Sequence, residues 1–236
     1  MITALSTGPI LTFLAYLSGM AIFFVFSLRR GFDKQGTALI MIAGLVGGVV
    51  GAKLTRMLFL AGTGLDPLSL FAHPDGRTIT GGVLFGWLAV ELAKRRLGVN
   101  RSTGDGFALA LSFGEFVGRL GCFFNSCCCG AAAASIPWAV YQDGAMRHPA
   151  QLYSAVWSLT IFLSLLLATR FLETRREGDL FRYYLIAWGS GRFILEFFRE
   201  RTEVVAGLSL AQWLCLEIAL AMAVGLIVRA RKKETA

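Results

Sequence analysis

Residues 9–28 read P-I-L-T-F-L-A-Y-L-S-G-M-A-I-F-F-V-F-S-L and contain no charged residue. An apolar run of about 20 residues is long enough to cross the hydrocarbon core of a bilayer as one helix, because each residue adds about 1.5 Å. No basic residue precedes this run and no convincing small-residue cleavage site closes it. We therefore expect a retained transmembrane helix rather than a cleaved signal peptide.

Six further apolar stretches follow along the chain. The stretch at residues 80–92 is too short to cross a membrane alone, so a helix there would need to include neighbouring residues. The others are residues 37–60, 106–124, 151–168, 180–198 and 210–228. The composition agrees, since 56% of the residues are hydrophobic, 16% are charged and the mean hydropathy is +0.63. We predict an all-α polytopic membrane protein with about seven transmembrane helices, forming a single domain over residues 1–236.

Basic residues are distributed unevenly between the two sides of these predicted helices. When the connections are assigned to alternate sides, 15 of the 23 lysines and arginines fall on one side. Basic residues are enriched on the cytoplasmic side of membrane proteins, so we expect the N-terminus outside and the C-terminus inside. The same distribution explains the net charge of +8, and no nucleic-acid partner is expected.

The eight basic residues on the opposite side are informative, because an arginine at membrane depth is costly and is usually kept where it meets an anion, a cavity or a partner. Four of them belong to three unusual segments. Residues 118–130 read G-R-L-G-C-F-F-N-S-C-C-C-G, residues 147–153 read R-H-P-A-Q-L-Y, and residues 191–199 read G-R-F-I-L-E-F-F-R.

These segments resemble the prolipoprotein diacylglyceryl transferase family, whose Gly-Arg signature, R-H-P-S-Q-L-Y-E segment and G-R-F-x-x-E-F-F-R segment occur in the same order. A looser resemblance at residues 16–19, 48–53, 81–82 and 208–216 extends it over nearly the whole chain. The resemblance implies transfer of a diacylglyceryl group from phosphatidylglycerol to the lipobox cysteine of a prolipoprotein, at the outer side of a bacterial inner (cytoplasmic) membrane. The implied partners are phosphatidylglycerol, the prolipoprotein signal peptide and membrane lipids, and neither a metal nor another cofactor is expected.

The resemblance also implies the roles of individual residues. The catalytic residues would be Arg119, Arg192, Glu196 and His148. The substrate would be bound by Arg119, Asn125, Gly130, Arg199, Gln151, Tyr153 and Tyr16.

Three departures from the family pattern bear most on the chemistry. Thr80 stands where the family usually has a histidine before the glycine pair. Within the signature, Cys122 and Cys127 replace an asparagine and a glutamate. Thiols thus replace an amide and a carboxylate, whereas Arg119, Asn125 and Gly130 remain at the matching positions, so lipid binding is expected to be retained and the identity of the proton acceptor stays open.

Without the family resemblance, the charged residues of the three segments allow either a functional or a structural interpretation. Arg192, Glu196 and Arg199 share one face if they lie on one helix, where they would form either a phosphate clamp or an ion pair between helix ends. Arg119 lies about 20 Å into its apolar stretch, which is too deep for an ordinary loop charge. It would either contact a lipid headgroup or extend to the interface. His148 precedes a helix-starting proline and is expected mainly to position other groups.

Cys122, Cys127, Cys128 and Cys129 follow a C-x4-C-C-C spacing that matches no structural zinc pattern. They would either fill space as small apolar side chains, or act as reactive thiols or as ligands of a soft metal. Two rival functions therefore stay open. The first is a paralogue that transfers a lipid group to another acceptor, through a covalent intermediate on Cys127. The second is a non-catalytic protein that binds lipid or handles thiols or metals.

Overall fold

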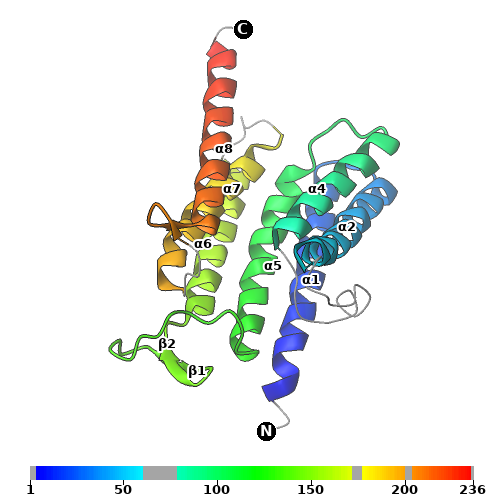
Figure 1. Cartoon of the computed structure of the whole chain (residues 1–236). Helices are drawn as coiled ribbons and strands as arrows, with labels where there is room; N and C mark the ends of the chain where they lie inside the picture. The colour runs from blue at the N-terminus through cyan, green and yellow to red at the C-terminus, as the bar shows by residue number, and fades with distance from the viewer. Residues whose placement is uncertain (1–3, 61–78, 172–176, 200–203, 235–236) are drawn as a thin grey trace. The chain divides into compact units, whose positions relative to one another are not determined.

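The computed structural model describes residues 4–60, 79–171, 177–199 and 204–234. Seven long helices and two short hairpins occur in this part of the chain (Figure 1). The helices are α1 (Ala4–Arg29), α2 (Lys34–Leu60), α4 (Ile79–Arg96), α5 (Gly104–Phe124), α6 (Ala150–Phe171), α7 (Asp179–Leu195) and α8 (Leu210–Glu234). A single 3-10 turn, η1 (Glu196–Phe198), follows α7 directly.

Five of the described helices are long and apolar enough to cross a membrane, namely α1, α2, α5, α6 and α8. The prediction of a mostly helical chain with several candidate membrane helices is therefore confirmed. The helices α4 and α7 contain 18 and 17 residues. At 1.5 Å per residue they are about 27 and 26 Å long, slightly less than the roughly 30 Å of a bilayer core. The count of seven spans and the orientation of the termini stay predictions.

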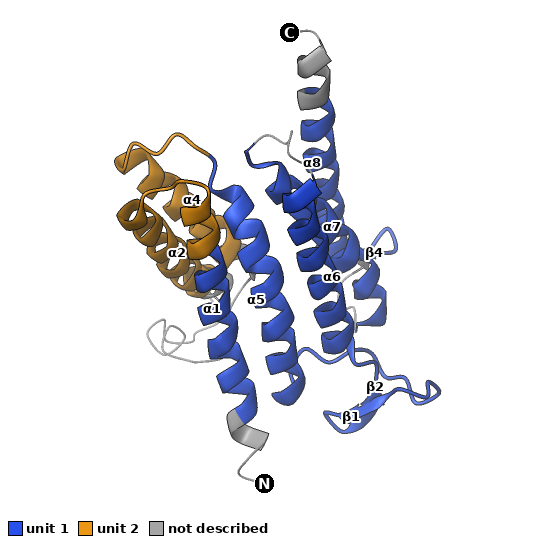
Figure 2. Cartoon of the chain, turned by 180° about the vertical axis from the view of Figure 1, so that it is seen from behind, with its two compact units in different colours: residues 1–23, 102–236 blue, residues 24–101 orange. Residues whose placement is uncertain are grey.

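Two compact units make up the described structure, and Figure 2 colours them separately. In the unit of residues 24–101, α2 and α4 pack closely through glycines. A methyl group on Gly82 would lie 3.2 Å from the carbonyl oxygen of Gly48, and one on Gly86 would lie 3.3 Å from that of Gly44. Small residues at these positions let the two backbones approach each other, as is common for helix pairs in lipid.

In the unit of residues 1–23 and 102–236, α5 packs against the first part of α1 and against α6 and α7. A methyl group on Gly121 would lie 3.1 Å from the carbonyl oxygen of Gly8, and the rings of Phe23 and Phe107 lie 4.2 Å apart. The helices α7 and α8 also pack against each other. The contact between Gly121 and Gly8 holds the end of α5, where the first of the three sequence segments lies.

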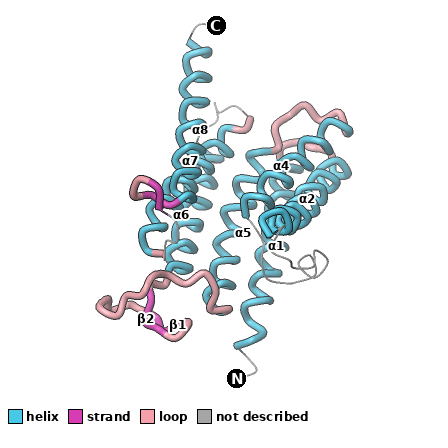
Figure 3. The backbone as a smooth tube through the Cα atoms, viewed as in Figure 1, coloured by secondary structure: helices cyan, strands magenta, loops and turns pink. Residues whose placement is uncertain are grey.

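Two short β-hairpins lie in the connections between helices, one between α5 and α6 and one between α7 and α8 (Figure 3). Strand β1 (Val140–Gln142) pairs antiparallel with β2 (Ala145–Arg147), and β3 (Val204–Val205) pairs with β4 (Leu208–Ser209). Each turn has two residues with positive φ, +50° at Asp143 and +77° at Gly144 in the first. This is the geometry of a tight two-residue hairpin turn. Because β2 ends at Arg147, His148 and Pro149 lie directly before α6.

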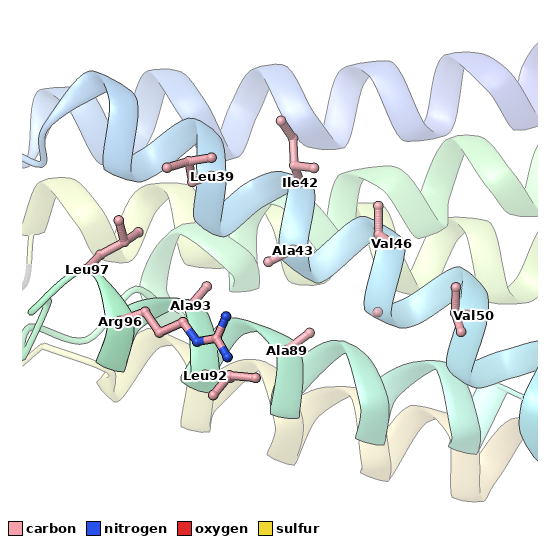
Figure 4. A pocket seen from close by; sticks show the side chains of 11 residues that line it. Leu39, Ile42, Ala43, Val46, Val50, Ala89, Leu92, Ala93, Arg96 and Leu97 are labelled. Carbon is pink, nitrogen blue, oxygen red and sulfur yellow. The ribbon is translucent and has the colours of Figure 1, made fainter.

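An apolar groove of about 590 Å³ runs along α2 and α4 (Figure 4). Arg96 is the one charged side chain among the residues that line it. The others are Leu39, Ile42, Ala43, Val46, Gly47, Val50, Ala89, Leu92, Ala93 and Leu97. None of the three sequence segments contributes to this groove, so it does not offer the groups that a transfer reaction needs.

Candidate active site

The three sequence segments meet at the end of α5 and the start of α6. The backbone N–H of Gly130 donates to the carbonyl oxygen of His148 at 3.1 Å, and that of Ala131 donates to Phe198 at 2.9 Å. A methyl group on Gly130 would collide with both carbonyl oxygens, so this position accepts only glycine without rearrangement. Parts of the chain that are far apart in sequence are therefore joined by backbone hydrogen bonds at one point.

Arg119 is paired with a carboxylate that the sequence analysis did not identify. Its Nη2 lies 3.2 Å from Oε1 of Glu115, one turn earlier on α5, and its Nε lies 3.4 Å from the same oxygen. The side chains of Arg119 and Glu115 are only 12% and 20% exposed. The signal was present in the sequence, since a glutamate four residues before an arginine in an apolar run is a favourable helical pair. Glu115 neutralises Arg119 while leaving several of its N–H groups available.

Glu196 is buried and is held from two sides. Its Oε2 lies 2.5 Å from Nη1 of Arg192, in an ion pair without the alignment of a hydrogen bond. Its Oε1 accepts a hydrogen bond from the Ser209 hydroxyl at 3.3 Å. Ser209 is positioned in turn by Gln212, whose Oε1 accepts from the Ser209 backbone N–H at 2.9 Å. The carboxylate of Glu196 is thus committed to Arg192 and to the turn that begins α8.

The expectation that Arg192, Glu196 and Arg199 share one helical face is wrong for Arg199. Helix α7 ends at Leu195, and Arg199 has an extended backbone with φ −114° and ψ 158°. Its Nη2 donates to the carbonyl oxygen of Cys128 at 3.2 Å. Burial lowers the pKa of the Arg199 guanidinium, and the nearby charges of Arg192 and Arg119 lower it further. Arg199 therefore lies close enough to both Arg192 and Arg119 to be repelled by their charges.

Gln151 ties the cysteine-containing loop to the start of α6. It is 1% exposed, and its Nε2 donates to the carbonyl oxygen of Cys127 at 2.9 Å and to Oε1 of Gln142 at 3.0 Å. Gln142, on β1, donates to the carbonyl oxygen of Phe123 at 3.2 Å. Two glutamines thus connect α5, the loop, the hairpin and α6. Gln142 was missed because nothing in its local sequence distinguishes it.

His148 belongs to an aromatic cluster with Tyr153 and Phe198. The Nδ1 atom of His148 lies 3.2 Å from the Tyr153 hydroxyl oxygen, which accepts a hydrogen bond from Nε1 of Trp138 at 2.7 Å. The ring of Phe198 lies 5.3 Å from that of His148. If the Tyr153 hydroxyl donates to Nδ1, the proton of the imidazole ring lies on Nε2, where it can be donated to another group. This arrangement favours a positioning role for His148 over that of a base.

The loop after α5 brings three thiols together. The Sγ atoms of Cys122, Cys127 and Cys128 all lie within 4.8 Å of one another, and Cys127 and Cys128 are exposed. A hydrogen bond from Cys122 lowers the pKa of the Cys128 thiol to about 5, and the charges of Arg199 and Arg119 act in the same direction. Burial raises the pKa of Cys127. Exposed thiols of this kind favour the reactive-thiol interpretation over that of apolar filler.

Asn125 lies at the edge of this arrangement, and Tyr16 lies outside it. Asn125 caps the end of α5, and its side chain contacts Gly8 of α1. Tyr16, on α1, is 41% exposed and makes no hydrogen bond or ring contact with another described residue. The side chain of Thr80 is not among the described ones. The structure therefore brings all the expected site residues together except Tyr16.

Comparison with known proteins identifies the family. The family model for prolipoprotein diacylglyceryl transferase matches residues 8–228. A phosphatidylglycerol–prolipoprotein diacylglyceryl transferase of Idiomarina loihiensis is 32% identical, over 93% of this chain and 88% of its own length. The protein of the same name from Bordetella bronchiseptica is also 32% identical, over 92% of this chain and 91% of its own. The chain belongs to the prolipoprotein diacylglyceryl transferase family.

Proposed function

We propose that this protein transfers the diacylglyceryl group of phosphatidylglycerol to the lipobox cysteine thiol of a prolipoprotein. The observation that carries the proposal is the convergence of Arg119, Arg192 and Arg199 in a protein whose described part has five helices apolar enough to cross a membrane. Phosphatidylglycerol is an anion that reaches the protein through the membrane. A cluster of half-buried arginines at the end of membrane helices is suited to its phosphate.

The charges of the site fit a phosphodiester. Three arginines face the two carboxylates of Glu115 and Glu196. Arg199 is held by a hydrogen bond to a carbonyl oxygen, whereas the other two arginines are paired with carboxylates, and its positive charge favours the thiolate of Cys128. A phosphate anion would bind at Arg199 without disrupting either carboxylate ion pair.

The reaction requires an attacking thiolate, a bound lipid and a stabilised leaving group. The thiolate sulfur forms a bond to the terminal glyceryl carbon of the diacylglyceryl group, and the bond from that carbon to the phosphate oxygen breaks. Arg119 and Arg192 stabilise the charge that develops on the departing glycerol phosphate, with Arg199 in support. Gln151, Gly130 and Asn125 shape the loop beside it, and Glu196 holds Arg192 in position.

His148, Tyr153 and Tyr16 complete the substrate site. His148, hydrogen-bonded to Tyr153, orients a headgroup oxygen through its Nε2 proton. Tyr16 is exposed on α1, where it contacts lipid rather than the reacting atoms.

The proposed setting is the inner membrane of a bacterium, with seven spans, the N-terminus outside and the C-terminus in the cytoplasm. The distribution of basic residues supports this orientation, since the last predicted span is followed by a run of basic residues at 229–233. Lipids and the signal peptide of the prolipoprotein then reach the site from within the membrane.

The test is a transfer assay with purified protein, phosphatidylglycerol and a lipobox peptide, followed by mass spectrometry of the peptide. The expected product is the peptide plus one diacylglyceryl group, with none formed from a peptide in which serine replaces the cysteine. A lipid adduct on the protein instead of on the peptide would support transfer through Cys127. The absence of any adduct would support a non-catalytic lipid-binding protein.

A further inference from the structure

Three sulfur atoms of the site are arranged as a set of metal ligands. Cys122 projects from the last turn of α5, and Cys127 and Cys128 come from the loop that follows. Their Sγ atoms lie within 4.8 Å of one another. Cys129 has a different environment, because its Sγ lies 3.4 Å from the carbonyl oxygen of Ser126 and 3.6 Å from Nε2 of Gln151. The cluster therefore has three members rather than four.

The spacing of these atoms is close to that of a zinc site. Zinc binds thiolates at about 2.3 Å with tetrahedral geometry, which places two sulfur ligands about 3.8 Å apart. The most distant pair in this cluster would need to approach by no more than about 1 Å. A side-chain rotation of Cys127 or Cys128, both of which are exposed, is sufficient for that change.

The loop that carries two of the thiols is held in place by other elements. Gln151 of α6 binds the carbonyl oxygen of Cys127, and Arg199 binds that of Cys128. The backbone of Cys128 has a positive φ of 58°, which a cysteine adopts only when its surroundings impose it. The three sulfur atoms are thus brought together by the packing around the loop and not by chance flexibility.

We propose that Cys122, Cys127 and Cys128 bind one Zn²⁺, and that its fourth position takes the cysteine thiol of the prolipoprotein. Structural zinc sites have four protein ligands, whereas catalytic sites have three and an open position. The exposure of Cys127 and Cys128 leaves this cluster open on one side. This inference rests on the proposed function, because it gives the acceptor substrate its place in the site, and it replaces the expectation that no metal is needed.

Charge supports the assignment. Zn²⁺ with three thiolates carries one negative charge, and the bound substrate thiolate adds a second. Arg119 and Arg199 both act on Cys128, so the anionic zinc site lies beside positive charge, part of which Glu115 offsets at Arg119. In this chain Cys127 stands where the family has a glutamate. Zinc would make a proton acceptor at this position unnecessary, because a thiol that coordinates zinc is deprotonated.

The reaction balances without an oxidant or a reductant. The substrate thiol displaces water from zinc and loses its proton to solvent. The bound thiolate then forms the bond from sulfur to carbon, while the bond from that carbon to the phosphate oxygen breaks and the electron pair stays with glycerol phosphate. The thioether product is a weak zinc ligand, so water replaces it.

The first experiment measures metal binding by the full-length protein in detergent. Zinc content is determined by mass spectrometry after dialysis, and Co²⁺ replaces zinc as an absorbing probe. We expect one zinc per chain, with thiolate-to-cobalt charge-transfer bands and the visible bands of tetrahedral cobalt.

Cys122→Ser, Cys127→Ser and Cys128→Ser should each weaken zinc binding by more than about a hundredfold, which exceeds the loss typical of residues that only support a ligand. Cys129→Ser is the matched control and should bind zinc as the wild type does. A protein that binds no zinc, or whose binding is unchanged in all three variants, would overturn the proposal.

The second experiment separates the zinc site from the transfer reaction. A lipobox peptide should shift the visible bands of the cobalt-loaded protein, and the same peptide with serine in place of cysteine should not. Transfer is then measured before and after zinc is removed with a chelator. Equal transfer without bound zinc would refute the binding of the substrate thiol to zinc during transfer and leave the proposed function intact. A band shift with no transfer in the zinc-loaded protein would refute the proposed function and leave the site intact.

Discussion

Replacing Arg119 with lysine tests the assignment of phosphate binding to this residue. In the structure, two N–H groups of its guanidinium, on Nε and Nη2, point at one oxygen of Glu115. The remaining donors lie in a fixed planar fork that matches two phosphate oxygens, whereas a lysine ammonium is a point charge. Arg119→Lys keeps the positive charge beside Glu115 but loses the two-pronged contact. A charge-assisted hydrogen bond contributes about 1.5–3 kcal/mol, so transfer should fall about tenfold to a hundredfold.

The assay compares kcat/KM for peptide lipidation in wild-type and variant protein at equal amounts of folded, inserted enzyme. Arg182→Lys is the matched control, since Arg182 pairs with Asp179 at 3.3 Å on α7 and takes no part in the site. It should transfer lipid at nearly the wild-type rate. Wild-type kcat/KM in Arg119→Lys would refute the reasoning and reduce Arg119 to a structural partner of Glu115.

Three further predictions follow from the structure. Gly130→Ala should disrupt the junction of the three segments, because the added methyl group collides with two carbonyl oxygens, and should lower the free energy of unfolding by about 1–3 kcal/mol, as a thermal shift assay would detect. Ser209→Ala removes a hydrogen bond of about 1 kcal/mol to the buried carboxylate of Glu196. The kcat of transfer should therefore fall about fivefold, while the KM for phosphatidylglycerol should change little. A change in KM alone would contradict this prediction. Reporter fusions after Arg30 and after Lys233 should both report the cytoplasm, and an extracytoplasmic signal at the C-terminus would exclude seven spans.

The helices and the three arginine-containing segments could be recognised from sequence because each depends on a strong local signal. Apolar runs mark the helices, and the arginine-containing segments stand out against them. The glycine at position 130 has a clear physical role once the backbones of His148 and Phe198 are placed beside it.

Other features depend on contacts that no local pattern reveals. The change at the end of α7 from α-helix to a 3-10 turn and then to extended backbone directs Arg199 toward the loop, although its spacing fits an uninterrupted helix. Gln142 becomes important only because the hairpin places it next to Gln151. The C-x4-C-C-C spacing matches no familiar metal motif, since the cluster is formed by a helix end and a loop with a positive φ. These are consequences of tertiary packing.

The chemistry of transfer can be tested most directly with phosphatidylglycerol that carries a heavy isotope in its headgroup glycerol. If the protein is a diacylglyceryl transferase, the lipobox peptide gains a diacylglyceryl group that contains no phosphorus and no label. The label is then released as glycerol phosphate in an amount equal to that of the lipidated peptide. A peptide that retains phosphate or label, or label release without peptide lipidation, would contradict the account.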